Sequence, residues 1–555
     1  MNYLKRLSDM KANRPTRRRF LAQSGCGAMG ALSMVNTLAH LKLMQGALAQ
    51  SAGSGYKALV CVFLNGGNDS NNLFIPATGT ARADYDTARP FDLATSRGIG
   101  VPVDHLNRVQ PLNAASLYEM NAGYNAGTDP FGFHTRAPHF KTLFDAEDLA
   151  VLCNVGTLTE AGMTRATYGT ADRPPQLFSH ADQQKQWQSS VPDRPFTSGW
   201  GGRVADLLDP IHNTAGSSVS MNISIAGVNS LMVSATGQVS PYIMNQNGVV
   251  GLSGYGTRYA NALLNTEGAV FDPANYTTSD HGKRLKAFEK IVQMTHDNLL
   301  EGGYNGVVYN ARFMEGLVGG ALGDTDNGTG GTTLDQHFID AYAGAGQPGG
   351  QDAAGSFALQ MKMVARLIAG RTHLGNNRQI FFVQLTGWDT HLAQNNNSTL
   401  FSGTAAGHNA LIGNLSCAMK GFSDAMKALG VWDDVTCFTA SDFARTFNPN
   451  KPVTDLTAGT DHAWGGHAVV MGGKVKGGRV YGKFPNLVLG SATGSLDATG
   501  SRGRWIPTTS VDQYAAVLAR WMGVDSELHT VFPNLHRFDD PFSVASANLD
   551  FMDLT

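Results

Sequence analysis

Acidic and imidazole side chains follow, or closely precede, apolar segments of this chain. The residues in these positions are Asp69, Asp389, His391, Asp442, Asp461, His462 and His467. Carboxylate and imidazole together suit Zn(II), Mn(II) or Fe, whereas sites made only of oxygen ligands suit Ca or Mg. Carboxylates crowded together without a cation would repel one another. The pattern therefore predicts a divalent metal site, with Zn first and Mn, Ca or Mg as alternatives.

Each of these residues taken singly has a simpler interpretation. A lone Asp-x-His, such as Asp389 and His391, often belongs to a solvated loop. Asp69 lies in a Gly- and Asn-rich turn, where Asp is favoured by turn chemistry alone. The joint occurrence of these residues beside buried segments is what favours a metal.

The apolar segments themselves predict strands. They are 56–64, 149–155, 379–386, 435–440 and 469–472. Their apolar residues run continuously rather than alternating, which indicates strands covered on both faces, as in a parallel sheet. The carboxyl ends of such strands form the edge where α/β proteins bind ligands.

Helical periodicity fills the intervals between several of these strands. It predicts helices over 356–369, 408–429 and 511–522, the last with Ser510 as N-cap. Strand and helix alternation predicts an α/β fold with a mainly parallel central sheet flanked by helices. Two stretches interrupt this pattern and are the Gly/Asn-rich insertions of the predicted fold.

The two interruptions differ in composition. Residues 215–260 predict short strands and turns. Residues 302–355 are dense in Gly, Asn, Asp and Thr and predict a loop-rich insertion, which could cover a site as a lid.

Composition excludes several classes of protein. The chain has 555 residues, of which 42% are hydrophobic, so it can bury a large core and is not a disordered chain. Beyond residue 49 it holds 34 basic and 43 acidic residues, a net charge of −9. A mildly acidic body argues against a nucleic-acid partner, which needs a basic face.

The first 49 residues resemble a signal peptide for export. The segment TRRRFL (16–21) precedes a weakly apolar run, and Ala47-Leu48-Ala49 resembles a cleavage site. The paired arginines before Phe-Leu resemble a twin-arginine signal, which implies the twin-arginine export machinery as partner and a periplasmic or extracellular location. An N-terminal amphipathic helix or membrane anchor is the alternative. No later stretch has about 18 uninterrupted apolar residues, so no stable span is expected after cleavage.

Four cysteines remain after the signal. Cys61, Cys153 and Cys437 lie inside predicted strands, and Cys417 lies in a predicted helix. Four cysteines allow three complete disulfide pairings. Buried thiols that act as small hydrophobic side chains are the favoured interpretation.

Several longer motifs resemble the DUF1501 family of exported bacterial proteins. They are FLNGGNDSNNLFIP (64–76), PPQLFSHADQQKQWQSS (174–190), SGWGGR (198–203), GWDTH (387–391), TASDFARTF (439–447), GTDHAWGGHAVVMGGKVKGG (459–478) and PTTSVDQYAAVLARWMGV (507–524). The resemblance spans 56 to about 545, so we expect one domain over 50–555. The family in turn resembles the alkaline phosphatase and sulfatase superfamily, which implies two divalent metals at the strand ends.

This second resemblance assigns roles to the candidate residues. It implies that Asp69 binds one metal and that Asp389 and His391 bind the other. Asp442 would match the later metal-binding Asp of the superfamily. His462 or His467 would be the last histidine ligand. Phe443 stands where the superfamily commonly has a histidine, and Asp461 or His462 would have to fill that gap.

The superfamily also implies a nucleophile at a helix N-terminus. Ser179 opens a predicted helix and is the first candidate, with an ordinary N-cap as the alternative. Thr157 is the second candidate. His180 could be a ligand, bind a substrate oxygen or simply pack, and Arg445 and Arg203 could bind an anionic group or form structural ion pairs.

These expectations lead to two functions. The first is an exported metal-dependent hydrolase of phosphate or sulfate esters, with a small anionic ester or glycan as substrate. The second is a binding or surface-assembly protein that keeps the fold without turnover, with or without a structural metal.

Overall fold

The computed structural model describes residues 55–92, 97–113, 130–213, 219–248, 333–352, 356–395, 407–452, 455–543 and 549–554, together with Lys283, Ala287 and Val318. The chain divides into two compact units, Met1–Ser51 and Ala52–Thr555, and all described residues belong to the second. The export signal predicted for 1–49 and most of the insertion predicted for 302–355 lie outside the described residues.

A nine-stranded sheet forms the centre of the second unit. Its order is β13-β7-β12-β11-β1-β10-β8-β9, and β14 pairs with the end of β7. The strands are β1 (Lys57–Asn65), β7 (Leu149–Gly156), β8 (Asn222–Ser224), β9 (Tyr242–Ile243), β10 (Arg378–Thr386), β11 (Val435–Ser441), β12 (Gly466–Gly472), β13 (Val480–Gly482) and β14 (Thr509–Ser510). β1 pairs in parallel with both β10 and β11, and β12 is antiparallel to β11 and β7.

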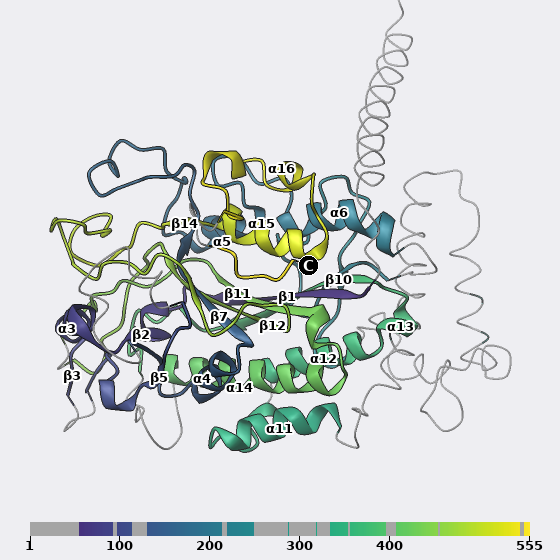
Figure 1. Ribbon diagram of the computed structural model, residues 1–555, viewed down its shortest axis with the longest axis horizontal. Helices are drawn as coiled ribbons and strands as arrows, with labels where there is room; N and C mark the ends of the chain where they lie inside the picture. The colour runs from purple at the N-terminus through teal and green to yellow at the C-terminus, as the bar shows by residue number, and fades with distance from the viewer. Residues whose placement is uncertain are drawn as a thin grey trace, which may run out of the picture. The chain divides into compact units, whose positions relative to one another are not determined.

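Helices cover both faces of this sheet (Figure 1). One face carries α4 (Pro138–Asp145), α11 (Leu334–Gly344), α12 (Phe357–Ala369) and α14 (Gly407–Ala428), with the short α13 (Arg371–Leu374) after α12. The other face carries α5 (His180–Ser189), α6 (Trp200–His212), α15 (Val511–Met522) and α16 (Leu528–Val531). The interior residues of the long strands are consequently buried on both faces, which explains their continuous apolar sequences.

Smaller elements extend the sheet region at one side. A three-stranded antiparallel sheet joins β2 (Phe74–Pro76), β6 (Phe131–Phe133) and β5 (Asn107–Val109), near helix α3 (Gly79–Ala88) and the hairpin β3 (Phe91–Asp92) and β4 (Arg97–Gly98). Short 3-10 helices cover Ser70–Asn72, Val103–His105, Gly350–Asp352, Trp432–Asp434 and Leu535–Arg537.

The structure confirms the predicted mainly parallel sheet with flanking helices. All five predicted strands form, as β1, β7, β10, β11 and β12, and the three predicted helices form as α12, α14 and α15. Ser510 caps α15 in a capping box with Gln513. Short strands and turns also fill the described part of 215–260.

Two predictions need correction. β12 is antiparallel, because the chain enters it directly from a loop at the edge where β11 ends. The segment predicted as a loop-rich insertion contains α11, whose Leu334, Phe338 and Tyr342 are buried. α11 packs against α14 and α12, so this part of the segment belongs to a helical layer rather than to a lid.

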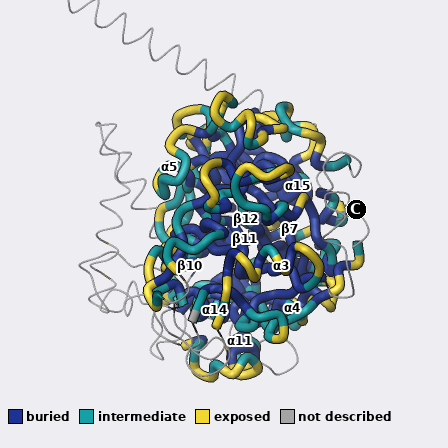
Figure 2. The backbone as a smooth tube through the Cα atoms, turned by 90° about the vertical axis from the view of Figure 1, so that its left-hand side faces the viewer, coloured by how far each residue is buried: buried dark blue, intermediate teal, exposed yellow. Residues whose placement is uncertain are grey.

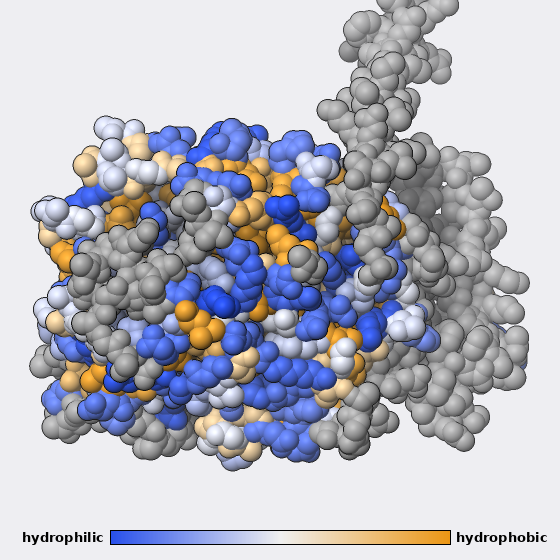
Figure 3. All heavy atoms as spheres, viewed as in Figure 1, coloured by the Kyte–Doolittle hydropathy of each residue, from blue (hydrophilic) through white to orange (hydrophobic). Residues whose placement is uncertain are grey.

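Buried apolar residues form a large cluster and a separate smaller one around Trp464 and Ile506, and the described surface is mixed. Buried residues fill the sheet and the inner faces of the helices (Figure 2). Polar and apolar residues alternate over the face seen in Figure 3. Cys61, Cys153, Cys417 and Cys437 are buried free thiols. Among the described residues, no helix is both long enough and apolar enough to cross a bilayer.

Candidate metal centre

The residues of the candidate site lie on loops at one edge of the central sheet. β1, β10 and β11 run parallel, so their carboxyl ends meet there. Asp389 and His391 follow β10, and Asp442 follows β11. Because β12 runs the opposite way, the loop that enters it brings His462 to the same edge. An isolated bridge between Arg445 and His462 joins the last two loops.

Gly66 allows the loop after β1 to pass close to the loop after β10. Its φ is +118°, in the region that favours glycine. A Cβ atom at this position would lie 2.5 Å from the backbone nitrogen of Asp389. The backbone nitrogen of Gly66 also donates to Oδ1 of Asp442 at 3.2 Å. Gly66 therefore lets the loop after β1 approach the loop that carries Asp389 and His391.

Three imidazoles surround the carboxylate of Asp389. The Nε2 atoms of His391 and His462 lie 3.2 Å and 3.3 Å from its Oδ1 atom. Nε2 of His180 lies 3.6 Å from its Oδ2 atom. Ligand-capable atoms of His180, Asp389 and His462 all lie within 4.8 Å of one another. The structure thus brings together three residues predicted as ligands and His180, which was predicted to contact substrate.

The Nδ1 atom of each imidazole, on the opposite side of the ring from Nε2, forms a hydrogen bond that orients the ring. Nδ1 of His180 lies 2.7 Å from Oδ2 of Asp442, and Nδ1 of His391 lies 3.1 Å from Oδ1 of Asp461. Nδ1 of His462 lies 2.7 Å from the carbonyl oxygen of Phe178. Carboxylate and carbonyl oxygens only accept hydrogen bonds, so each Nδ1 carries the hydrogen and donates it.

This assignment leaves a lone pair on every Nε2 atom of the neutral rings. The three lone pairs and the Asp389 carboxylate then face one another, and all four are acceptors. Nε2 of His180 is buried and has no hydrogen-bond partner among the described residues. Such a group of acceptors is stable only with a cation or a shared proton between its members.

Neighbouring charges set the protonation of the group. Burial favours the neutral form of Asp389, but the hydrogen bond and charge of Arg445 outweigh it and hold the pKa of Asp389 below its usual range. The hydrogen bond from His180 to Asp442 raises the pKa of His180, which favours the charged form of this ring when no cation is bound. Burial lowers the pKa of His462. An ionised carboxylate and a neutral imidazole are the forms that bind metals.

Asp442 and Asp461 support the imidazoles rather than join the four converging groups. Asp442 is buried and also accepts a hydrogen bond from Gln184 at 3.0 Å. Asp461 accepts from Arg502 at 2.7 Å and from Asn450 at 3.2 Å. Both residues were predicted as ligands. Their contacts instead resemble the outer carboxylates that fix the orientation of metal-binding histidines.

Arg445 was predicted to bind an anionic substrate, and its contacts speak against that role. Its side chain has no exposed surface, and its Nη1 atom donates to Oδ1 of Asp389 at 2.8 Å. Its other nitrogens donate to the side chain and backbone of Thr460. The guanidinium therefore holds Asp389 in place and has no free face for a ligand.

Asp69 lies apart from the group, contrary to the prediction that it binds metal. Both of its oxygens accept hydrogen bonds from Arg89, at 2.8 Å and 2.9 Å, and Gln394 donates to it at 2.6 Å. The side chains of Asp69 and Arg89 are both fully buried. Arg89 thus supplies the positive charge that a metal was expected to supply.

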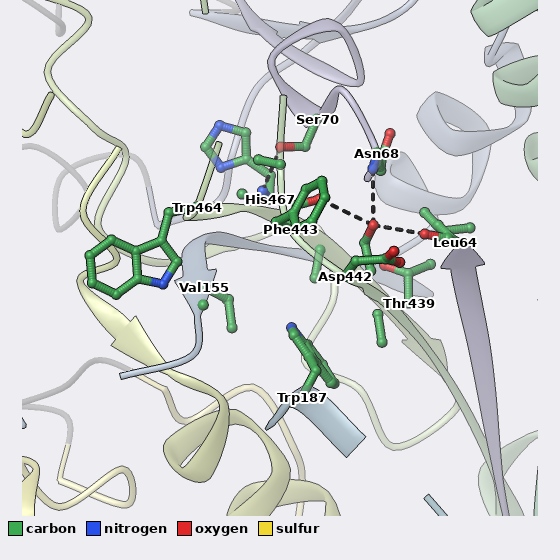
Figure 4. Close-up of a pocket in the computed structure, with 16 residues that line it drawn as sticks. Leu64, Asn68, Ser70, Val155, Trp187, Thr439, Asp442, Phe443, Trp464 and His467 are labelled. Carbon is green, nitrogen blue, oxygen red and sulfur yellow. Dashed lines mark hydrogen bonds between the residues drawn. The ribbon is translucent and has the colours of Figure 1, made fainter. Parts of the chain in front are cut away.

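His467 also lies outside the group. It lines a small cavity of about 30 Å³ together with Asp442, Trp187 and Trp464, as Figure 4 shows. Its Nδ1 atom accepts a hydrogen bond from the backbone of Asn154 at 3.3 Å, and its ring stacks on Phe484. Burial lowers the pKa of His467 to about 3, so it packs as a neutral ring.

The predicted nucleophiles and the second arginine are engaged elsewhere. The hydroxyl of Ser179 donates to Asp182 at 2.6 Å, and the side chain does not cap the α5 backbone. Thr157 accepts a hydrogen bond from Gln183 at 3.4 Å. Arg203 is buried and donates to backbone carbonyls, among them that of Val531 at 2.7 Å.

Two supporting residues were not foreseen from the sequence. Phe178 contributes only its carbonyl oxygen, with a φ of +73°, and no side-chain pattern could have indicated it. Gln184 lies four residues after His180 on α5, so helical spacing could have paired the two. Phe443 forms a floor, since its ring centroid lies 4.7 Å from that of His180 and 4.5 Å from that of His462.

Comparison with known families supports the resemblance seen in the sequence. Residues 335–497 match the family described as "Protein of unknown function (DUF1501)". The segment is similar to members of the DUF1501 family. It contains Asp389, His391, Asp442 and His462, so most of the candidate centre lies within the matched residues. A search of curated proteins finds no match to the chain.

Proposed function

We propose that this chain is a metal-dependent hydrolase of phosphate or sulfate esters. The observation that carries the proposal is the convergence of three Nε2 lone pairs on the carboxylate of Asp389. His180, His391 and His462 are each oriented by a separate acceptor, which is the arrangement that metal-binding histidines need.

The donor set fits a borderline metal ion. Imidazole nitrogens with one carboxylate oxygen suit Zn(II), and also Mn(II) or Fe, better than Ca or Mg. His391, His462 and Asp389 would hold the metal, and the buried unpartnered Nε2 atom of His180 faces the same space. When bound, such a metal would supply Lewis-acid polarisation of an ester oxygen and activation of water.

The exposure of the group favours catalysis over a closed structural site. The side chains of Asp389, His391 and His180 keep 46%, 41% and 32% of their surface exposed. A solute can therefore reach them, whereas structural metal sites are enclosed by their ligands. The hydrogen bond from Arg445 favours the ionised form of Asp389, and the ring of Phe443 packs against that of His462.

We further propose an alkaline-phosphatase-like arrangement with one metal rather than two. The mainly parallel sheet with site residues at its strand ends supports this relationship. The Asp69–Arg89 ion pair argues against a second metal beside Asp69. Without a free nucleophilic hydroxyl at Ser179, water is the simplest attacking group.

A non-catalytic binding protein is the second candidate. The observations that favour it are the engagement of Ser179 with Asp182 and the burial of Arg445, which leave no predicted nucleophile or anion-binding residue free. In this function the metal would stabilise the loops at the sheet edge. Under either function, the sequence at 16–49 supports twin-arginine export to the periplasm or the cell exterior.

The deciding experiment measures turnover and metal content on the same protein. Purified exported protein is assayed with 4-nitrophenyl phosphate and 4-nitrophenyl sulfate after loading with Zn(II) or Mn(II). We expect turnover that is lost in Asp389→Asn and His462→Gln but kept in His529→Gln, whose side chain is 77% exposed and lies outside the site. Stoichiometric metal without turnover of any ester would favour the second candidate, and absence of metal would contradict both metal-based functions.

A further inference from the structure

A pocket opens on the segment that leads into the candidate metal centre. Its volume is about 360 Å³, and it is lined by Tyr168, Arg173, Leu177 and neighbouring residues of the same segment. Leu177 is followed by Phe178, whose carbonyl orients His462, and then by Ser179 and His180. The pocket wall and two of the converging imidazoles are therefore connected through a few residues.

Two arginines of this region have guanidinium nitrogens without a protein partner among the described residues. Arg173 lines the pocket, and Arg504 lies over Phe178, the residue after the pocket-lining Leu177. Arg173 lies over the ring of Tyr168, with its guanidinium carbon 4.4 Å from the ring centroid, and no hydrogen-bond partner for it occurs among the described residues. Arg504 lies over Phe178 at 4.9 Å, and only its Nε atom is bonded, to the carbonyl oxygen of His462 at 3.1 Å. The terminal nitrogens of Arg504 have no partner among the described residues.

Both arginines are fixed in position by their rings. Tyr168, Leu177 and Phe178 pack against the same hydrophobic cluster, which includes Trp464 and Ile506. Stacking on an aromatic ring limits the freedom of a guanidinium and leaves its edge free to donate hydrogen bonds. Pre-positioned arginine forks are the groups that bind carboxylate, phosphate or sulfate in a bidentate manner.

The other arginines near the centre differ from these two. Arg445 is buried and bonded to Asp389 and Thr460, and Arg502 is bonded to Asp461. Their positive charges are balanced by carboxylates of the site. Arg173 and Arg504 have no carboxylate partner among the described residues, so their guanidinium groups are available to a soluble anion.

We propose that this pocket, with Arg173 and Arg504, is a subsite for the non-reacting part of the substrate, and that this part carries a second anionic group. The inference rests on the proposed function for the reacting part. Pro174, Pro175 and Leu177 give the pocket apolar surface, which suits a ring or similar body between the two charges. The substrate class is then a bis-anionic ester, not a simple monoester.

The test compares two matched non-hydrolysable compounds. (4-Carboxyphenyl)phosphonate carries a second anionic group, and (4-methylphenyl)phosphonate is similar in shape but lacks it. Dissociation constants are measured by calorimetry on the metal-loaded exported protein and on Arg504→Gln and Arg173→Gln. Arg520→Gln is the control, because Arg520 also lies over an aromatic ring, that of Phe542, but on another part of the molecule.

We expect wild type to bind the carboxylated compound about tenfold more tightly, as charge-assisted hydrogen bonds would give. The preference should fall to about threefold or less in Arg504→Gln and Arg173→Gln and should remain in Arg520→Gln. Equal affinities in wild type, or a preference unchanged in both site variants, would overturn the inference. A preference that persists in Asp389→Asn supports the subsite even if the protein hydrolyses no ester, so the two proposals can fail separately.

Discussion

The Nε2 atoms of His391 and His462 lie 2.8 Å apart, although the Nδ1 atom of each ring already donates to an oxygen. Two neutral rings held in this way present lone pairs to each other, which is unfavourable unless a cation or proton lies between them. The rings come from different loops, one after β10 and one before β12. Their approach therefore requires either a cation or a shared proton between the two rings.

Removing one ring of this pair should remove metal binding. We expect His391→Ala to lower Zn(II) affinity by at least 100-fold, because a ligand and its contact with Asp461 are both lost. The measurement is competition with a chromophoric chelator, followed by elemental analysis. His529→Ala serves as control, and unchanged affinity in His391→Ala would remove this histidine from the centre.

Asp442 should act on metal affinity through His180. Asp442→Asn keeps the shape of the side chain but weakens the hydrogen bond to Nδ1 of His180. We expect a loss of about 10-fold to 100-fold in metal affinity if His180 is a ligand, the range typical of outer partners of metal-binding histidines. Retention of full affinity would mean that His180 does not bind the metal.

The Asp69–Arg89 pair should affect stability and not metal content. Both side chains are fully buried, so Arg89→Met leaves an uncompensated carboxylate, at a cost of about 3–5 kcal/mol. The double variant Asp69→Leu with Arg89→Met should recover part of this loss. Denaturant unfolding measures the stability, and elemental analysis of the Asp69→Asn protein should show the same metal content as wild type. A loss of metal there would restore Asp69 as a ligand.

Gly66→Ala should disturb the site more than a glycine change in open space. Its Cβ would meet the backbone of Asp389, and its φ of +118° is strained for alanine. Gly237→Ala is the control, because Gly237 has a φ of +76° and nothing within 4 Å of the added atom. Both variants pay about 1–2 kcal/mol of backbone strain in unfolding free energy. Only Gly66→Ala should also weaken metal binding, and equal effects in the two variants would argue against the close approach.

Acid should destabilise the protein through two buried histidines near α14. Burial lowers the pKa of His134 to about 3 and that of His408 to about 4. The unfolded chain binds protons near pH 6.5, so between about pH 6.5 and 4 it binds more protons than the folded chain. Stability therefore falls as pH falls through this window, by roughly 2 kcal/mol or more per histidine.

The replacement His408→Phe tests this directly. The ring of His408 lies against Trp388 at 5.4 Å, so a phenyl ring of similar shape should pack in its place. We expect the slope of unfolding free energy against pH between 6.5 and 4 to become shallower in His408→Phe. An unchanged slope would show that other groups cause the acid sensitivity.

The sequence by itself determined the sheet and its principal helices. Mainly apolar segments such as 435–440 indicated strands covered on both faces, and helical spacing indicated α12, α14 and α15. The rule that ligands bind where parallel strands end selected Asp389 and His391, but it selected Asp69 and Asp442 equally, and His462 was chosen because it closely precedes a strand. The matched DUF1501 segment covers Asp389, His391 and His462.

The tertiary structure decided which of the selected residues face one another. Asp69 and Asp389 both follow strands that are adjacent in the sheet, so their sequence contexts are similar. Only Asp69 pairs with Arg89, which lies twenty residues further along the chain. His462 and His467 lie five residues apart, and only the antiparallel entry into β12 sends the first to the site and the second into the core. The side chain that pairs with a loop residue comes from a distant part of the chain, and the local sequence around the loop residue carries no information about it.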